Sequence, residues 1–310
     1  MKKSRSGNRP INGNLALTIG TFDGVHVGHQ LLLDETREIA QDRGIKSAAY
    51  TYEIPPRRYL NDAGPPLIMD PEKKLDLLRN SVGQVILGDF LEVKDYSPKR
   101  YVEEILVERL KVDAVVVGKE WRFGQGRSGS YKELKELSKG RFTVHPQNQV
   151  KKRGKPVSST WIRQVIAEGE MELAEELLGR YPSYLGKVVE GEQVGEEIGF
   201  PTANLRIDER VGLPMNGNYA AFVELNGEKL GSAVHVGNRP TFGGTRDHQM
   251  EVHLIGYEGD LYGEQLEVKI IKYLGKTRKY EKKEELTRAI SGYVVEAKKV
   301  LQGLSSFTII

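Results

Sequence analysis

Hydrophobic residues in the first half of the chain alternate between short continuous runs and stretches with helical spacing. Four runs predict buried strands: Leu15–Ile19, Ser47–Tyr52, Gln84–Leu87 and Ala114–Val117. Three intervening stretches predict helices: Gln30–Asp42, Pro71–Asn80 and Tyr101–Leu110. Strands that alternate with helices in this way favour a parallel sheet that is covered by helices on both faces.

The pattern changes near residue 180. The segment Ser159–Gly179 has helical spacing and ends before Tyr181-Pro182. Five later runs predict strands: Tyr184–Val189, Asn218–Leu225, Lys229–Val236, Met250–Ile255 and Gln265–Tyr273. The pair Asn226-Gly227 is a strong signal for a tight hairpin between two of them. The second half is therefore expected to form an antiparallel barrel or sandwich with a C-terminal helix over Lys283–Leu301.

Length and charge set the broad class of the protein. The chain has 310 residues, and we expect one domain over residues 1–182 and another over residues 183–310. The formal net charge of +3 is a weak basic bias. It suits anionic ligands such as nucleotides but does not argue for a nucleic acid partner. The sequence contains no cysteine, which excludes disulfides, thiolate catalysis and cysteine-ligated zinc.

Nothing in the sequence predicts a membrane protein. The polar N-terminal residues Met1–Asn14 lack the apolar core of a secretory signal. No run approaches the ~18 apolar residues that a membrane span needs. We therefore expect a cytoplasmic protein with no membrane partner, and self-association is left open.

The segment from Gly20 to Gln30 is the first candidate for chemistry. It reads G-T-F-D-G-V-H-V-G-H-Q and lies where a predicted strand ends and a helix begins. Ligands bind at such strand ends in parallel sheets, and a helix N-terminus favours phosphate. His26 and His29 are three residues apart, so both imidazoles are expected on one side, where they can stabilise a phosphate. A metal site is less favoured because the motif is not H-E-x-x-H.

Two further segments narrow the reaction. Val157–Arg163 reads V-S-S-T-W-I-R, and Val117–Gly124 reads V-G-K-E-W-R-F-G. With the H-V-G-H segment they resemble the nucleotidyltransferase half of the prokaryotic bifunctional riboflavin kinase/FAD synthetase family. Glu120 and Trp121 stand in the acidic and aromatic positions of the family's third motif.

The resemblance implies a Rossmann-like adenylyltransferase in which an FMN phosphate oxygen attacks the α-phosphorus of ATP. His26 and His29 would stabilise the transferring phosphate, and Arg163 would hold the leaving pyrophosphate with two hydroxyls. Mg²⁺ would bridge the phosphates. The ATP-binding residues implied in this half are Gly20, Phe22, Asp23, Gly24, Gly28, Gly118, Arg122, Phe123, Ser159 and Thr160. On the flavin side, Pro55 stands where the family usually has a histidine, so a polar group is missing there.

The second candidate site begins at the segment Gly199–Asn204, which reads G-F-P-T-A-N and resembles the G-F-P-T-A-N motif of riboflavin kinases. In the predicted strand after residue 249, Glu251 faces the side opposite to Met250. The resemblance makes Glu251 the general base for the ribityl 5′-hydroxyl of riboflavin. The ATP-binding residues implied in this half are Gly195, Gly199, Pro201, Thr202 and Asn204, with Thr202 and Asn204 holding Mg²⁺. The chain has no P-loop motif.

The second half also departs from the family pattern. Glu196 replaces an arginine of the ATP loop, where a carboxylate would repel phosphates. The family's flavin-contacting tail reads close to R-x-E-x-x-F and is followed by an Asp. The corresponding positions are Gly275, Thr277, Tyr280 and Tyr293.

These departures leave alternatives open beside the leading hypothesis of a bifunctional enzyme that converts riboflavin to FMN and FMN to FAD. In one alternative only the adenylyltransferase step is active. Another is a non-catalytic flavin-sensing or RNA-binding regulator, supported only by the basic run Lys151–Lys155, which is more typical of a solvated mobile loop. A different adenylyl- or cytidylyltransferase is disfavoured by the motifs of the second half.

Overall fold

The fold was analysed in a computed structural model, which describes residues 14–60, 64–191, 199–225, 227–240, 246–278 and 282–304. The chain divides into two compact units. The first is Met1–Pro65 with Lys74–Pro156, and the second is Pro66–Lys73 with Val157–Ile310. Residues 157–182 thus group with the second unit, whereas the boundary expected from the sequence lies at residue 182. The assignment of separate functions to residues 1–182 and 183–310 stays a prediction.

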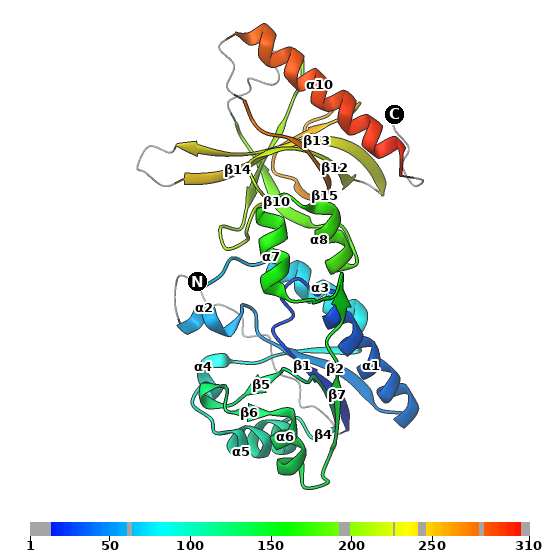
Figure 1. Cartoon of the computed structure of the whole chain (residues 1–310), viewed down its shortest axis with the longest axis vertical. Coiled ribbons are helices and arrows are strands. Elements are labelled where there is room, and N and C mark those ends of the chain that lie inside the picture. Colours follow the sequence, from blue (N-terminus) through cyan, green and yellow to red (C-terminus); the bar gives the residue numbers. More distant parts are fainter. Residues whose placement is uncertain are drawn as a thin grey trace. The chain divides into compact units, whose positions relative to one another are not determined.

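A five-stranded parallel sheet forms the centre of the first unit (Figure 1). Its strands are β1 (Leu15–Ile19), β2 (Lys46–Thr51), β3 (Gln84–Leu87), β4 (Val112–Gly118) and β7 (Thr143–Gln147). Their order across the sheet is β3-β2-β1-β4-β7, so the order reverses at β1. The α/β class and all four strands expected from the sequence are confirmed, and β7 is an additional edge strand.

Helices cover both faces of this sheet, as the alternating pattern predicted. Helix α1 (Val27–Arg43) packs Ile39 and Ala40 on one face, against Ala16 and Val116. On the other face, the helix Tyr101–Arg109 and α6 (Tyr131–Ser138) pack against the remaining side chains of β1 and β4. Because the central strands β1, β2 and β4 are buried on both faces, their sequences are mostly continuous runs of small and apolar residues rather than alternating ones.

Short elements complete the first unit. They are α2 (Pro56–Leu60), α3 (Pro71–Ser81, which begins in the second unit), α4 (Phe90–Val93), α5 (Pro98–Arg100), β5 (Arg122–Phe123), the 3-10 turn Gln125–Arg127, β6 (Gly129–Ser130), β8 (Lys151–Lys152) and β9 (Lys155–Pro156). The pairing of β8 with β9 shows that the basic run is a tight hairpin and not an irregular loop. Its two turn residues, Arg153 and Gly154, have φ of 47° and 76°. These left-handed values match the twist of a two-residue hairpin.

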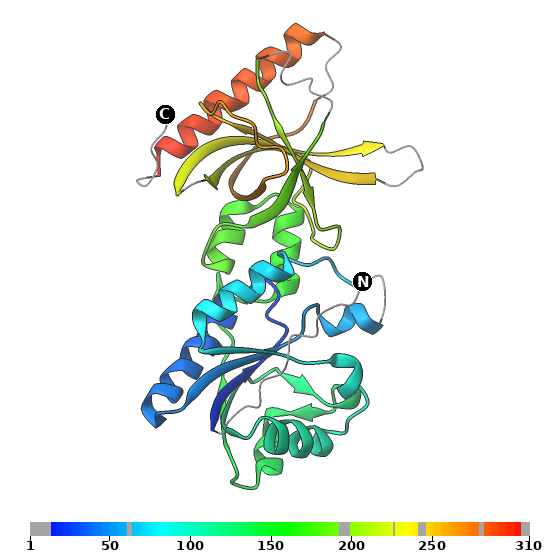
Figure 2. The same cartoon turned by 180° about the vertical axis from the view of Figure 1, so that it is seen from behind.

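A closed antiparallel barrel forms the second unit, with strand order β10-β11-β14-β13-β12-β15 (Figure 2). The strands are β10 (Ser183–Val189), β11 (Ala203–Ile207), β12 (Gly217–Leu225), β13 (Glu228–Pro240), β14 (Arg246–Leu254) and β15 (Gln265–Gly275). Leu225 pairs with Glu228, so a two-residue turn joins β12 to β13 as predicted. Gly227 has φ of 84° there, and Asn226 lies outside the described residues.

The C-terminal helix α10 (Lys283–Gln302) lies on the outer surface of the barrel. Its residues Val294, Ala297 and Leu301 are buried against Ala220 and Phe222 of β12. The barrel interior is filled by the alternate residues of the same strand, which include Tyr219 and Val223. This alternation of inward and outward side chains is the two-residue period expected of a strand with two packed faces.

The segment Ser159–Gly179 is helical, as predicted, but it consists of two helices. Helix α7 (Ser159–Ala167) ends before Gly169, and α8 (Met171–Leu178) follows. Gly169 has φ of 78°, which a continuing helix cannot accommodate. The spacing of apolar residues continues through the break, so the hydrophobic pattern of the sequence does not reveal it.

Leu134 tests the packing of the first unit, because its side chain on α6 is fully buried. Leu134→Ala is expected to lower the free energy of unfolding by about 2–5 kcal/mol, since it leaves a cavity. Leu91→Ala is the matched control, because Leu91 is 55% exposed and its loss should cost less than about 1 kcal/mol. Urea titrations of the full chain measure both, and equal losses would contradict the packing described here.

Candidate active sites

The loop between β1 and α1 holds its backbone in left-handed conformations. Phe22, Gly24 and Val25 have φ of 50°, 82° and 38°. Such values are unusual for non-glycine residues, above all for a β-branched valine. Phe22 and Val25 are buried, so packing holds the strained turn in place. Strain of this kind is concentrated at ligand-binding loops. The loop therefore fits the ligand site that the sequence predicted at this strand end.

His26 and His29 lie together at the start of α1. Their rings stack with centroids 3.6 Å apart and an interplanar angle of 16°. His26 Nδ1 accepts a hydrogen bond from the backbone N–H of His29 at 3.3 Å, which caps the helix. An accepting Nδ1 places the proton of a neutral ring on Nε2, which can then donate to a phosphate oxygen. A Cβ on Gly28 would lie 3.2 Å from the His26 ring, so glycine leaves the ring its space.

The segment after β4 forms an aromatic surface. Trp121 stacks on Phe123 with centroids 4.8 Å apart and an angle of 12°. Phe123 is buried, whereas Trp121 is half-buried. A Cβ on Gly129 would lie 2.6 Å from the Phe123 ring, which explains this glycine of the motif. Arg122 donates to the carbonyls of Lys119 and Trp121 and so fixes the turn that begins at Gly118.

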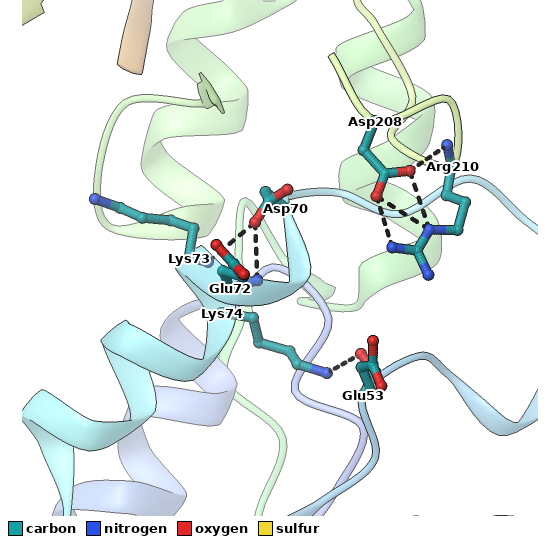
Figure 3. A network of polar contacts seen from close by, with 7 residues as sticks. All are labelled: Glu53, Asp70, Glu72, Lys73, Lys74, Asp208 and Arg210. Carbon is teal, nitrogen blue, oxygen red and sulfur yellow. Dashed lines mark hydrogen bonds and ion pairs between the residues drawn. The ribbon is translucent and has the colours of Figure 1, made fainter. Parts of the chain in front are cut away.

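A buried lysine supports the segment that follows β2 (Figure 3). Lys74 of α3 is 4% exposed and donates to the carbonyl oxygens of Tyr52 and Glu53 at 2.5 Å and 2.8 Å. Burial lowers the pKa of Lys74 to about 8, although the carboxylates of Asp23 and Glu53 act in the opposite direction. Lys74 therefore lies beside both the β1–α1 loop and the predicted flavin side of the unit. Pro55, which follows this segment, is buried.

Aromatic side chains surround that segment. Tyr52 contacts Tyr50 and Phe90 edge to face, with centroids 5.7 Å and 5.8 Å apart. Tyr59 of α2 lies 5.8 Å from Phe90 and is 38% exposed. Burial raises the pKa of Tyr52 to about 12, so its hydroxyl stays protonated and can donate. The group offers flat apolar surface beside hydrogen-bonding hydroxyls, which suits a planar heterocycle.

The V-S-S-T-W-I-R segment begins α7 in the second unit. Ser158 caps this helix, because its hydroxyl accepts from the backbone N–H of Trp161 at 3.3 Å. Ser159 and Thr160 are the first helical residues, and the Thr160 side chain is exposed. Arg163 donates through Nε to the carbonyl of Pro66 at 2.6 Å. The segment thus combines a helix N-terminus, two hydroxyls and a guanidinium, groups that bind phosphate.

A pocket of about 480 Å³ opens on the barrel beside the G-F-P-T-A-N segment. Pro201, Thr202 and Asn204 line one side, and the loop Tyr257–Tyr262 lines the other. The Asn204 side chain is 6% exposed. A Cβ on Gly191 would lie 1.9 Å from its Nδ2 atom, so this amide is held against glycine backbone. The volume lies within the ~300–1,000 Å³ of small-ligand sites.

A second pocket, of about 320 Å³, lies between the outer surface of the barrel and α10. Thr202 lines both pockets. Glu251 and His253 project into the second pocket from β14, while Met250 and Val252 are fully buried, as the alternation predicted. Thr277 and Tyr293 line its far side. Gly199 is described but lines neither pocket, whereas the predicted Gly195 and the departures Glu196 and Tyr280 lie outside the described residues.

Comparison with known proteins identifies both halves. The FAD synthetase family model matches residues 8–161, and the riboflavin kinase family model matches residues 178–301. The bifunctional riboflavin kinase/FMN adenylyltransferase of Pseudomonas fluorescens is 32% identical over 94% of each chain. Those of Haemophilus influenzae and Escherichia coli K12 are 33% and 34% identical, covering 94% and 89% of this chain and 96% and 89% of theirs.

The chain belongs to the bifunctional riboflavin kinase/FMN adenylyltransferase family. It is a transferase of flavin cofactor biosynthesis with nucleotidyltransferase and kinase functions, and the leading hypothesis from the sequence is confirmed. The fold also matches a solved structure, a macrolide-efflux protein from Streptococcus pneumoniae, with a TM-score of 0.85. That protein is 25% identical, and the match covers 96% of this chain and 97% of the other.

Two negative observations hold for the described part of the chain. No helix there is long and apolar enough to cross a membrane. No group of three or more His, Cys, Asp or Glu side chains gathers there in a way that could hold a metal ion. The hydroxyl of Thr202 and the amide of Asn204 nevertheless offer the hard oxygen atoms that Mg²⁺ prefers.

The sequence analysis missed two residues of these sites. Lys74 shares a helical face with the buried Leu78, four residues further along α3, and that spacing could have revealed a buried cation. His235 lines the second pocket from β13. Its predicted strand was recognised, but the register that aligns it with Glu251 depends on tertiary pairing and leaves no local signal.

Lys74 predicts a pH dependence of stability. Its folded pKa of about 8 lies below the unfolded value of 10.5, so between these values the unfolded chain binds the extra proton. Stability should therefore rise with pH in this window relative to Lys74→Met, by roughly 1 kcal/mol per pH unit. Denaturant titrations of both proteins at pH 7, 8, 9 and 9.5 measure the difference. Parallel pH dependences of the two proteins would show that folding does not lower the pKa of Lys74.

Proposed function

We propose that the first domain, residues 1–182, transfers AMP from ATP to FMN, and that the second, residues 183–310, phosphorylates riboflavin with ATP. The observation that carries the kinase assignment is the pair of pockets that share Thr202 as a lining residue. One pocket contains the hydroxyl of Thr202 and the amide of Asn204, groups suited to ATP bound with Mg²⁺. The other contains Glu251, the carboxylate suited to an alcohol substrate.

In the adenylyltransferase reaction, a phosphate oxygen of FMN attacks the α-phosphorus of ATP and the bond to the β-phosphate breaks. Pyrophosphate leaves, and no covalent enzyme intermediate is needed. His26 and His29 donate to the oxygens of the transferring phosphate, whose charge increases in the transition state. Ser159, Thr160 and Arg163 hold the pyrophosphate from the start of α7.

The substrates of the first domain meet different surfaces. The stacked pair of Trp121 and Phe123 suits the adenine ring, and the β1–α1 loop with its glycines suits the phosphates. Tyr52, Tyr59 and Phe90 offer the flat surface for the flavin ring. In this arrangement aromatic contacts take over the role of the histidine that the family usually has at the position of Pro55.

In the kinase reaction, Glu251 accepts the proton of the ribityl 5′-hydroxyl as its oxygen attacks the γ-phosphorus of ATP. Thr202 lines both pockets, which suits it to hold the γ-phosphate that must reach the hydroxyl. Mg²⁺ bound with ATP would neutralise phosphate charge, and Thr202 and Asn204 are the residues placed to hold it. The riboflavin ring would lie beneath α10, near Thr277 and Tyr293.

A chromatographic time course tests this assignment. Purified protein is incubated with ATP, Mg²⁺ and either riboflavin or FMN, and all three flavins are quantified. The proposal expects FAD from both substrates, with FMN appearing first when riboflavin is supplied. Formation of FAD from FMN alone would favour the alternative in which the second domain has lost or changed its kinase role.

His29→Ala is expected to lower the rate of FAD formation from FMN by roughly 10²–10³-fold, because a donor to the transferring phosphate is lost. The formation of FMN from riboflavin should persist at the wild-type rate. His145→Ala is the matched control, since His145 lies on the edge strand β7 of the same unit. Loss of both reactions in His29→Ala would contradict the assignment of the two sites.

Glu251→Gln is expected to impair the kinase reaction and to leave the adenylyltransferase reaction intact. The formation of FMN from riboflavin should fall by roughly 10²–10⁴-fold, because an amide of the same shape cannot accept the proton. FAD formation from added FMN should be unchanged. Glu228→Gln, at an exposed hairpin of the same barrel, is the control. A Glu251→Gln enzyme with normal kinase activity would remove Glu251 from its proposed role.

A further inference from the structure

The segment Pro66–Lys73 forms a strap that belongs to the second unit by its contacts. In sequence it lies within residues 8–161, which the FAD synthetase family model matches. The sulfur of Met69 accepts a hydrogen bond from Arg180 at 3.6 Å. At the end of the strap, Lys73 forms an ion pair with Glu267 of β15 at 2.6 Å. This part of the adenylyltransferase sequence is therefore anchored within the second unit.

The loop that follows β11 pairs with the start of the strap. The backbone N–H of Leu67 donates to the carbonyl oxygen of Arg210 at 2.7 Å. The backbone N–H of Gly212 donates to the carbonyl oxygen of Leu67 at 2.9 Å. The two bonds form a parallel bridge between Leu67 and Val211. Because both backbone polar groups of Leu67 are bonded to the loop, the loop fixes the strap at this point.

An acidic side chain holds this barrel loop, Asp208–Gly212, in shape (Figure 3). The carboxylate of Asp208 accepts from the backbone N–H of Arg210 at 2.9 Å, and from its guanidinium Nε and Nη2 at 3.0 Å and 2.6 Å. The N–H of Val211 donates to the carbonyl oxygen of Asp208 at 2.9 Å. A Cβ on Gly212 would lie only 3.0 Å from Cβ of Pro66, so glycine allows the strap to approach the loop closely.

The strap in turn orients Arg163 of α7. The Nε atom of Arg163 donates to the carbonyl oxygen of Pro66 at 2.6 Å. The guanidinium group is planar, so a bond through Nε also constrains the direction of its two terminal nitrogens. Pro66 directly precedes Leu67, the residue that the barrel loop binds. A continuous chain of hydrogen bonds and backbone thus leads from the barrel loop to the guanidinium of Arg163.

We propose that the barrel loop positions Arg163 for the adenylyltransferase reaction through the carbonyl oxygen of Pro66. This inference rests on the proposed function, in which Arg163 holds the leaving pyrophosphate. As the bond from the α-phosphorus to its bridging oxygen breaks, the electron pair and its charge pass to pyrophosphate, where a guanidinium stabilises them. A displaced guanidinium does this less well. The barrel therefore contains both the kinase site and a positioning element for the other reaction.

Two variants of the barrel loop, Gly212→Ala and Asp208→Ala, test this role in steady-state assays of FAD formation from FMN and ATP. The first adds a methyl group that presses on Pro66, and the second removes the carboxylate that holds Arg210. Each should lower kcat by roughly 5- to 50-fold, because the guanidinium is misplaced. Pyrophosphate should also inhibit both variants less than the wild type. The KM for FMN should not change, because Arg163 holds the other substrate.

Glu224→Ala is the matched control. Glu224 forms an ion pair with Lys269 at 2.8 Å on the same barrel, outside the barrel loop and the strap. Its loss should leave kcat for FAD formation unchanged. The formation of FMN from riboflavin should keep its wild-type rate in all three variants, because the described residues 208–212 line neither pocket of the barrel. That rate also shows that the barrel of each variant is folded.

A double-mutant cycle separates positioning from a general loss of structure. In the Arg163→Ala background, Gly212→Ala should cause no further loss of kcat for FAD formation, because no guanidinium remains to be misplaced. An equal loss in both backgrounds would show that the barrel loop acts by another route and would overturn the proposal.

The same assays distinguish this inference from the function on which it rests. If the wild type forms no FAD from FMN, the proposed function of the first domain fails, and the inference fails with it. If the wild type forms FAD while Gly212→Ala and Asp208→Ala keep its kcat, only the role of the barrel loop is overturned.

Discussion

The lateral register of the barrel strands is the constraint on which the kinase site depends. Once β11, β14, β13 and β12 pair as they do, Asn204, Glu251, His235 and Asn218 must share one row. A slip of one residue in β14 would turn Glu251 into the barrel and expose Met250. The fully buried Met250 and Val252 oppose that slip, because exposing each would cost about 1.5–3 kcal/mol. Core packing thus fixes the position of the proposed base.

The first unit uses a different constraint at its site. A parallel sheet brings the ends of β1, β2 and β4 to one edge, and the loop after β1 is forced into left-handed turns at Phe22 and Val25. The buried Lys74 links two segments at this edge of the sheet. It donates hydrogen bonds to the carbonyl groups that follow β2, and it lies near Asp23 of the β1–α1 loop. A cation in such a position costs desolvation, which its two hydrogen bonds and the carboxylates offset only in part, because the pKa of Lys74 is still lowered.

Much of this architecture could be predicted from the sequence, because local periodicity determines it. The run Leu15–Ile19 is a strand in the structure with the same bounds, and the outward position of Glu251 follows from a two-residue alternation. The break at Gly169 could not be found, because the apolar spacing of α7 continues into α8. The β8–β9 hairpin was missed because its basic composition resembles that of a loop.

The site residues were predictable in part, for a related reason. His26 and His29 are close in sequence, so helical geometry alone placed them together, and the structure stacks their rings. Lys74 and His235 reach their sites through tertiary contacts with segments more than 15 residues away. A single sequence contains no local signal of such contacts. Two glycines do mark such contacts. At Gly129 and Gly191 a Cβ would clash with the side chains of Phe123 and Asn204, so only glycine leaves them room.

The central claim is that the two activities belong to two separate sites. It is tested most directly by mixing the variants His29→Ala and Glu251→Gln, each of which should fail to make FAD from riboflavin. The account predicts that the mixture forms FAD from riboflavin, ATP and Mg²⁺, because FMN released by the first variant is adenylylated by the second. FMN that accumulates in the mixture without conversion to FAD would contradict the account.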